Sequence, residues 1–518
     1  GAIGRGEDME ITTYLEQAMT SELQGNVVDL CPVGALTSKP YAFAARPWEL
    51  GKTESIDVMD ALGSAIRIDT RGREVMRILP RVNDAVNEEW ISDKTRHVVD
   101  GLRTQRLDEP YIRQGGRLRP ASWHEAFDTI AARLRSISPD RVGAIAGDLA
   151  AVEEMYALKD LLARFGTNNT DCRQDGAALE PNSGRATYLF NAGIAGIEQA
   201  DAFLLVGSNP RREAAVLNAR IRKRSRMGNF PIGVIGENAD LTYDYQHLGA
   251  GPQTLADIAA GRHGFAEVLS KAQRPLVIVG MGALARPDGA SVASLAAKVA
   301  TSCGNEDWNG YCVLHTAASR VGALDAGFIP GPGGRTAQEM AQPHALEVLF
   351  LLGADEIDIA PGPFVVYIGT HGEQGAHRAD VILPGAAYPE KSGIFVNTEG
   401  RVQMSGRASF PPGEAREDWA IIRALSDVLG HRLPYDSLPA LRRTLFQAHP
   451  HLQRIDQVSP GSRADVTALA ARGEATDKAP FVPAVEDFYL TNAIARSSPI
   501  MAECSALAES RGALRAAE

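Results

Sequence analysis

Short, continuous apolar runs alternate with helical patterns through the central part of this 518-residue chain. Such runs lie at residues 142–146, 202–206, 231–235, 276–279, 347–352 and 364–368. Runs of this length without polar alternation are typical of strands that are buried on both faces, as in parallel sheets covered by helices on both sides. We therefore predict an α/β domain of doubly wound parallel sheets over residues 106–404.

Two of the predicted strand-to-helix turns are rich in glycine. The turn at residues 207–210 reads GSNP, and the turn at residues 280–285 reads GMGALA, which is half of a dinucleotide-binding fingerprint. Backbone N–H groups at such turns can bind a phosphate, but any strand-to-helix turn favours Gly, Ser and Asn. The acidic residue expected about 20 positions after the second turn is missing, since Glu306 comes too late. We interpret both turns as structural.

The segments on either side of the α/β region have different sequence patterns. Residues 46–105 are predicted to form a small β-rich domain, in which Arg71 and Gly72 turn between strands at 64–69 and 74–79. This domain contains no cysteine. Ahead of it, residues 1–45 are predicted to hold a helix over about residues 9–23, and the tail, residues 405–518, is predicted to be helical.

The run DLCPVGAL at residues 29–36 places Cys31 at the end of a helix-like stretch. A Cys-Pro turn is typical of ferredoxin-type segments that present a thiolate to an iron–sulfur cluster. Pro32 ends the preceding element, and Gly34 lets the backbone come close to an inorganic sulfide. A tetranuclear cluster needs four ligands, yet the sequence has no Cys-x-x-Cys-x-x-Cys run. Cys31 is therefore either an ordinary cysteine or one ligand whose partners lie upstream of residue 1.

Longer strings resemble one protein family, in the same order along the chain. They are TSKPYAF at 37–43, ARPWE at 45–49, KTESIDVMD at 52–60, REVMRILP at 73–80, NEEWISDK at 87–94, NPR at 209–211, LTY at 241–243, HLG at 247–249, ADVILPG at 379–385, VNTEGR at 396–401 and REDW at 416–419. On these strings the chain resembles the large iron–sulfur subunit of respiratory complex I, NADH–quinone oxidoreductase, which is also called the 75-kilodalton subunit. The resemblance covers nearly the whole chain.

This resemblance implies a molybdopterin-oxidoreductase-like fold, as in formate dehydrogenase, behind part of a ferredoxin-like cluster segment. The implied function is to pass electrons from NADH, via flavin and iron–sulfur clusters, toward quinone in a proton-pumping chain, with no catalytic residue of its own. Cys31 is the implied 4Fe–4S ligand, and three further ligands are expected upstream of residue 1. A 2Fe–2S cluster and another 4Fe–4S cluster belong to the family's N-terminal part. No molybdopterin is expected.

The implied partners are other complex I subunits, including the flavin-bearing NADH-binding subunit and the iron–sulfur subunits of the peripheral arm. Contact with a membrane is expected only through the complex, on the cytoplasmic face of a bacterial inner membrane or the matrix face of the mitochondrial one. A net charge of −11 argues against binding to nucleic acid. The alternative is an active molybdopterin-dependent oxidoreductase, which molybdenum analysis would distinguish.

Two arginines, two histidines and two further cysteines are the remaining candidates for a cavity lining or a ligand site. Arg378 and Arg401 are predicted to line the polar cavity left where a cofactor sits in the related oxidoreductases. His371 and His377 lack a third ligand at a telling spacing, so we interpret them as loop histidines with protein partners. Cysteines 303 and 312 are nine residues apart, too far for a usual ligand pair, and are predicted to be buried as small hydrophobic residues.

Overall fold

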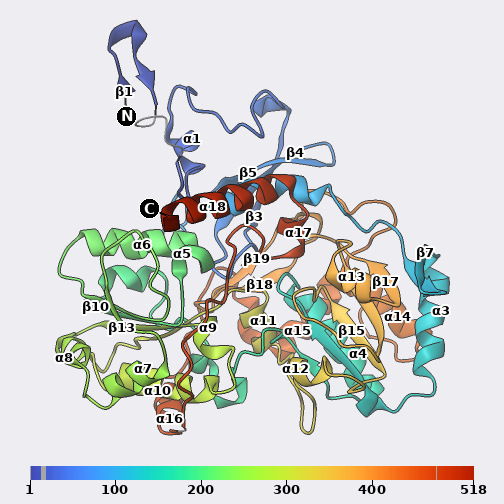
Figure 1. Cartoon of the computed structure of the whole chain (residues 1–518). Helices are drawn as coiled ribbons and strands as arrows, with labels where there is room; N and C mark the ends of the chain where they lie inside the picture. The colour runs from blue at the N-terminus through green and yellow to red at the C-terminus, as the bar shows by residue number, and fades with distance from the viewer. Residues whose placement is uncertain (1, 13–18, 474, 518) are drawn as a thin grey trace.

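The computed structural model describes residues 2–12, 19–473 and 475–517. Two α/β units lie next to each other and share one large hydrophobic cluster, and a small antiparallel sheet lies above them in Figure 1. No helix in the described ranges combines the length and apolarity that crossing a membrane requires.

The first unit is built on a five-stranded parallel sheet. Its strand order is β12 (Gln246–Gly249), β11 (Ile232–Ile235), β10 (Ala202–Val206), β13 (Pro275–Gly280) and β14 (Tyr311–Leu314). Leu205 and Ile278 pack on one face with α6 (Ala215–Arg226). Leu204 and Val277 belong to the cluster on the other face, which includes α7 (Pro252–Ala259), α8 (Gly264–Lys271) and α10 (Gly289–Thr301).

The second unit is built on a seven-stranded sheet. Its strand order is β7 (Arg117–Pro120), β6 (Tyr111–Gln114), β17 (Val381–Pro384), β16 (Phe364–Gly369), β15 (Val348–Leu352), β8 (Val142–Ala146) and β9 (Thr170–Asp171). Strands β17 to β9 are parallel, and β6 is antiparallel to both of its neighbours.

Helices cover both faces of this second sheet. Helices α3 (Trp123–Leu134), α4 (Val152–Phe165) and α14 (Asp418–Val428) share a cluster with Phe350 and Val366, whereas α12 (Ala337–Met340) and α13 (Gln374–Arg378) share a different cluster with Leu349 and Val365. Consecutive residues of one strand thus face opposite helical layers. The predicted fold of parallel sheets between helices is confirmed, because all six apolar runs are strands of these two sheets.

The small sheet consists of β3 (Gly51–Ile56), β4 (Ala65–Arg71) and β5 (Glu74–Pro80), all antiparallel. Its hairpin turn lies one residue later than predicted, because Arg71 still pairs with Glu74. The turn is therefore made by Gly72 and Arg73, and Gly72 has a φ of 63°, a left-handed conformation that glycine adopts without strain.

The predicted helix over residues 9–23 is wrong where the structure describes it. Residues 13–18 lie outside the described residues. Before them, β2 (Glu10–Ile11) pairs with β1 (Ala2–Ile3).

After them, residues 19–25 form an irregular path with turns that leads into α1 (Asn26–Leu30). Long-range partners hold this path: the carbonyl of Glu22 accepts from the Asp93 N–H at 2.8 Å, and its carboxylate pairs with Arg211 at 2.9 Å. These tertiary contacts override the helical periodicity of the local sequence.

The tail contains several helices, and these are distributed over the molecule. Helix α14 packs against α4 of the seven-stranded unit, α16 (Arg463–Ala470) packs against α10 of the five-stranded unit, and α18 (Pro499–Ala517) lies along the small sheet in Figure 1.

Residues near the C-terminus also complete the core of the small sheet. Ile494 and Met501 belong to the same buried cluster as Ile66 and Ile78. Beside them, the carboxylate of Asp100 accepts bonds from the Ile500 N–H, at 3.0 Å, and from the Ser498 hydroxyl. The small sheet thus depends on residues about 400 positions further along the chain.

Candidate functional site

Cys31 is the C-cap residue of α1, which ends at Leu30, and Pro32 follows it. Its side chain is partly exposed, and its Sγ atom accepts a bond from the backbone N–H of Leu36 at 3.5 Å. The loop of residues 31–36 therefore wraps around the sulfur.

This loop is suited to a thiolate. Backbone N–H groups of Leu36 and Val33, and more weakly those of Ala35 and Gly34, lower the pKa of the Cys31 thiol. Gly34 has a φ of 68°, and no other part of the protein comes within 4 Å of the position of a Cβ there. N–H donors that favour the thiolate form are also found where cysteine holds an iron–sulfur cluster.

No other cysteine of the chain has these features. Cys303 and Cys312 are buried, as predicted, and burial raises their thiol pKa values to about 11 and about 12. Burial likewise raises the pKa of Cys172 to about 12. Within the described ranges, no three side chains of His, Cys, Asp or Glu come together as a metal site. His371 bonds to the Gly101 carbonyl and to Thr370, at 2.8 Å each, which agrees with its interpretation as a loop histidine with protein partners.

The segment that carries Cys31 is held by residues of the small cysteine-free domain. Asp93 accepts the Gly25 N–H at 2.7 Å, and burial raises the pKa of Asp93 to about 6 against the effect of this bond. The amide of Asn26 donates to the Ile91 carbonyl at 2.8 Å and accepts the Ile91 N–H at 3.2 Å. Arg96 donates to Asn26 at 3.1 Å and pairs with Asp29.

The interior of that domain contains charges. Asp57, Asp60 and Lys94 are each at most 3% exposed, and Asp57 accepts the Thr95 hydroxyl at 2.8 Å. Burial and the neighbouring Asp60 raise the pKa of Asp57 to about 7, while burial lowers that of Lys94. The Lys94 ammonium donates to the Thr491 hydroxyl at 3.0 Å.

The two glycine turns meet at the carboxyl edge of the five-stranded sheet, after β10 and β13. They pack directly on each other: a Cβ at Gly280 would lie 2.4 Å from the Cβ of Ser208, and one at Gly282 would lie 2.8 Å from the Gly207 carbonyl oxygen. The carbonyl oxygen of Val482, from the C-terminal region, would lie only 2.3 Å from the Gly282 Cβ. This mutual packing leaves the turns no open cradle for a phosphate.

A cavity of about 560 Å³ remains beside these turns. Arg320 and Arg496 line it, and both already have protein partners: Arg320 pairs with Asp175 at 3.0 Å and Arg496 with Glu356 at 3.2 Å.

The prediction that Arg378 and Arg401 line this space is wrong. Arg378 donates to backbone carbonyls, among them that of Pro363 at 3.1 Å, in a surface hollow. Arg401 pairs with Glu399 at 2.7 Å and donates to the Asp456 carbonyl.

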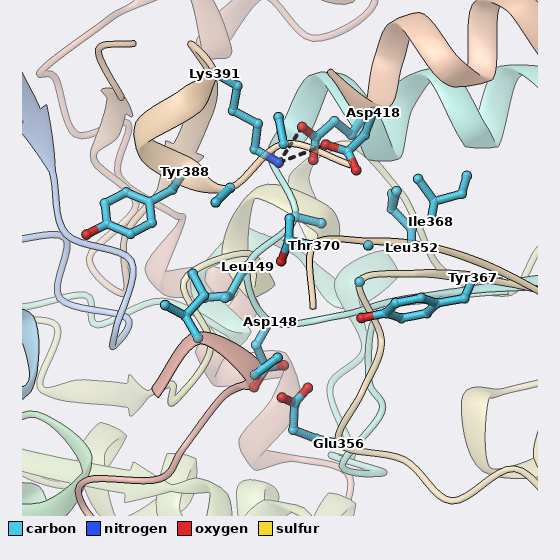
Figure 2. A pocket seen from close by; sticks show the side chains of 18 residues that line it. Asp148, Leu149, Leu352, Glu356, Tyr367, Ile368, Thr370, Tyr388, Lys391 and Asp418 are labelled. Carbon is cyan, nitrogen blue, oxygen red and sulfur yellow. Dashed lines mark hydrogen bonds and ion pairs between the residues drawn. The ribbon is translucent and has the colours of Figure 1, made fainter. Parts of the chain in front are cut away.

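A smaller cavity, of about 40 Å³, is closed on one side by a buried ion cluster. Figure 2 shows the Lys391 ammonium directed toward Asp418, with Tyr388 pointing away from both. Lys391 lies 2.6 Å from Glu154 and 3.1 Å from Asp418. Burial disfavours the ammonium, but the two carboxylates outweigh this and raise the pKa of Lys391.

Comparison with known proteins connects these features to a family. Iron–sulfur protein 1 of mitochondrial NADH dehydrogenase [ubiquinone] from Solanum tuberosum is 48% identical over 517 residues, covering 98% of this chain and 68% of that protein. The 75 kDa subunit of NADH–ubiquinone oxidoreductase from Reclinomonas americana is 45% identical, covering 98% and 76%. The chain belongs to this family of complex I subunits. Its role is that of an iron–sulfur subunit of NADH–ubiquinone oxidoreductase.

Sequence profiles of four domain families match successive parts of this complex I subunit. They are the subunit 3 ferredoxin-like domain of NADH–quinone oxidoreductase at 1–37, the NDSU1/NuoG-like 4Fe–4S domain of NADH–ubiquinone oxidoreductase at 50–100, molybdopterin oxidoreductase at 106–428 and the C-terminal domain of the NuoG-type subunit at 454–504. Among solved structures, acetylene hydratase from Pelobacter acetylenicus has a TM-score of 0.49 at 13% identity, covering 79% of this chain and 74% of that one.

Two of these profiles describe 4Fe–4S or ferredoxin-like domains, and only one of the two matched ranges contains a cysteine. Residues 1–37 contain Cys31 with its N–H donors. Residues 50–100 contain no cysteine, and the described interior there is occupied by apolar side chains and by Asp57, Asp60 and Lys94. Residues 50–100 therefore do not suit a cysteine-ligated cluster.

The residues that anchor Cys31 are not evident from the sequence. Asp93 and Arg96 lie more than 60 positions after it and belong to a predicted domain of their own. The string NEEWISDK at 87–94 indicated the family but gave no sign of the contact. Only the folded chain brings these residues to α1.

We predict that Lys391→Met lowers the free energy of unfolding by about 3–5 kcal/mol, because it leaves two buried carboxylates without their cation. The midpoint of urea unfolding measures this loss. The control is Lys271→Met, which removes an exposed pair with Glu267 on α8 and is expected to leave the midpoint nearly unchanged. Equal effects of the two variants would contradict the buried-cluster interpretation.

We also predict that Gly282→Ala destabilises the protein by roughly 1–3 kcal/mol, because both atoms that its methyl group meets belong to the backbone and cannot rotate away. Limited proteolysis should then cut residues 479–491 faster, as the Val482 contact opens. Gly264→Ala is the matched control: no atom lies within 4 Å of that Cβ, so cleavage and stability should stay as in the unaltered protein.

Proposed function

We propose that Cys31 is one ligand of a 4Fe–4S cluster on the electron path of complex I. The supporting observation is the loop of residues 31–36, whose N–H groups favour the thiolate at the end of α1. The other three ligands of this proposed cluster belong to chain upstream of residue 1. We also propose that the chain consists of four domains, with boundaries after residues 45, 105 and 404.

The cluster, when bound, accepts and releases one electron at a time. The residues of this chain do no bond chemistry in that process. They supply a thiolate, donate N–H bonds to its sulfur, and set how much water reaches it. Hydrogen bonds to the sulfur and limited solvent access are the ways in which a protein sets a cluster's reduction potential.

The surface around Cys31 supports a contact with another protein surface. Leu30, Val33, Phe43 and Trp48 are between 59% and 102% exposed, an unusual concentration of large apolar side chains within twenty residues. We propose that the iron–sulfur and flavin-bearing subunits of the peripheral arm bind this surface. The protein would then meet a membrane only through the complex, on the matrix face in mitochondria or the cytoplasmic face in bacteria.

Cys31→Ala in the complete complex should abolish or convert one tetranuclear cluster and stop electron flow to quinone, because no other cysteine precedes Cys172 in this chain. Low-temperature electron paramagnetic resonance of the NADH-reduced complex reports this. Cys303→Ala, at a buried thiol in the five-stranded unit, is the control and should leave every cluster signal in place. An unchanged spectrum for Cys31→Ala would refute the assignment.

A second test concerns metal content. This chain on its own should bind no stable tetranuclear cluster after anaerobic reconstitution with iron and sulfide, since a single thiolate cannot replace four ligands. Iron and sulfide are counted per chain after gel filtration. A stoichiometry of about four irons would contradict the proposal that the remaining ligands lie upstream.

A further inference from the structure

We propose that helix α2 (Asp93–His97) of the cysteine-free domain positions the Cys31 ligand, with Asp93 and Arg96 as the positioning residues. This inference rests on the proposed function, because it takes Cys31 to be a cluster ligand. The domain at residues 50–100 suits no cysteine-ligated cluster of its own. By positioning Cys31, it contributes to electron transfer through the neighbouring segment.

One side of α2 binds the Cys31 segment at three successive points. Asp93 accepts the Gly25 N–H at 2.7 Å, just before the first residue of α1. Arg96 reaches Asn26 at 3.1 Å in the first turn and Asp29 in the last. Arg96 is only 5% exposed, so water competes little for these bonds. Asp29 is two residues before Cys31, and the ion pair therefore fixes the end of the helix that presents the sulfur.

The approach of the two helices is close enough to define their relative position. A Cβ at Gly25 would lie 2.8 Å from the Arg96 Cδ and 2.9 Å from the Asp93 Oδ1. Any larger residue at Gly25 would displace the Arg96 and Asp93 side chains from these positions. Contacts of this kind transmit a shift of one helix to the other, because packed interiors have little free space.

The other side of α2 is fixed inside its own domain. The Ser92 hydroxyl accepts the Thr95 N–H at 3.1 Å and caps the helix, and the Thr95 hydroxyl donates to Asp57 at 2.8 Å. Lys94 extends from the same helix to Thr491. Helix α2 is therefore held from within by buried polar contacts and can serve as a rigid support for α1.

Loosening this support should alter the cluster without removing a ligand. If α1 shifts, the sulfur moves relative to the N–H groups of residues 33–36, and weaker hydrogen bonds to sulfur lower a cluster's reduction potential. Removing the Arg96 charge alone would also lower the potential, because the reduced cluster is the more negative form. A test must separate the effect of geometry from the effect of charge.

The double variant Arg96→Gln with Asp29→Asn separates geometry from charge. It removes one positive and one negative charge, so the net charge stays the same. We would measure the midpoint potential and the g-values of the cluster in the complete complex by electron paramagnetic resonance during redox titration. We expect a lower potential and altered g-values in the double variant, and a lower potential in Arg96→Gln. The control Arg81→Gln breaks a different ion pair of the same domain, with Glu54, and should change neither.

A potential and g-values in the double variant equal to those of the unaltered complex would overturn the inference, since Arg96 would then act through its charge alone. If Arg96→Gln prevents assembly, Asp29→Asn alone serves, because the Asp29 side chain is one-third exposed and its loss leaves α2 intact. Unchanged g-values in that variant would overturn the inference too.

Hydrogen–deuterium exchange gives a second measurement that does not depend on redox chemistry. The amides of residues 33–36 should exchange faster in the double variant, whereas those of residues 65–80 should not; unchanged exchange at 33–36 would contradict the inference. The Cys31→Ala variant distinguishes the two proposals. If it leaves all cluster signals in place, the proposed function itself fails; if it removes a cluster while the double variant behaves as unaltered, only the positioning role fails.

Discussion

Two buried carboxylates at the start of α4 hold the seven-stranded unit together. Glu153 accepts the Ile394 N–H and the Arg442 guanidinium, both at 2.8 Å, and Glu154 pairs with Lys391 at 2.6 Å. Both carboxylates are at most 2% exposed, so each loses its hydration and needs these partners in return. Because Ile394 and Lys391 belong to one segment and Arg442 to α15 (Leu438–Ala448), the first turn of α4 fixes several distant segments against the sheet. The Asp418 end of α14 is tied to the same ammonium.

Much of this architecture could be predicted from the sequence, because strands buried on both faces leave a continuous apolar pattern. The run at residues 202–206 became β10, in the middle of its sheet, and the run at residues 347–352 became β15. Features set by tertiary contact could not be predicted. The helical spacing over residues 9–23 indicated a helix, but Glu10 and Ile11 form a strand, and long-range bonds at Glu22 hold residues 19–23 in an irregular path. Arg378 and Arg401 resembled cavity residues by position, yet their guanidinium groups find carbonyl and carboxylate partners elsewhere.

The candidate site also has one part that could be predicted from the sequence and another that could not. Cys31 is visible in the sequence because its Cys-Pro context is local, and the structure adds the N–H groups that lower its pKa. Its supports, Asp93 and Arg96, left no pattern near it, since a hydrogen bond across more than 60 residues has no fixed spacing. The domain that carries them also shows how a 4Fe–4S domain family can include a member without ligands. Its described interior contains buried charges such as Asp57 and Lys94, each with polar partners.

The contact between the small sheet and the end of the chain has a consequence for biosynthesis. Ile494 and Met501 complete the core around Ile66, so that core stays open while the ribosome makes the intervening residues, more than 400 of them. At roughly 5–20 residues per second, this interval lasts on the order of 20–80 seconds. During that time the strands β3 to β5 are exposed to solvent and to chaperones. Stable seating of the N-terminal segment on α2 is therefore expected only after residues 494–501 have been synthesised, so a cluster that includes Cys31 would be completed late.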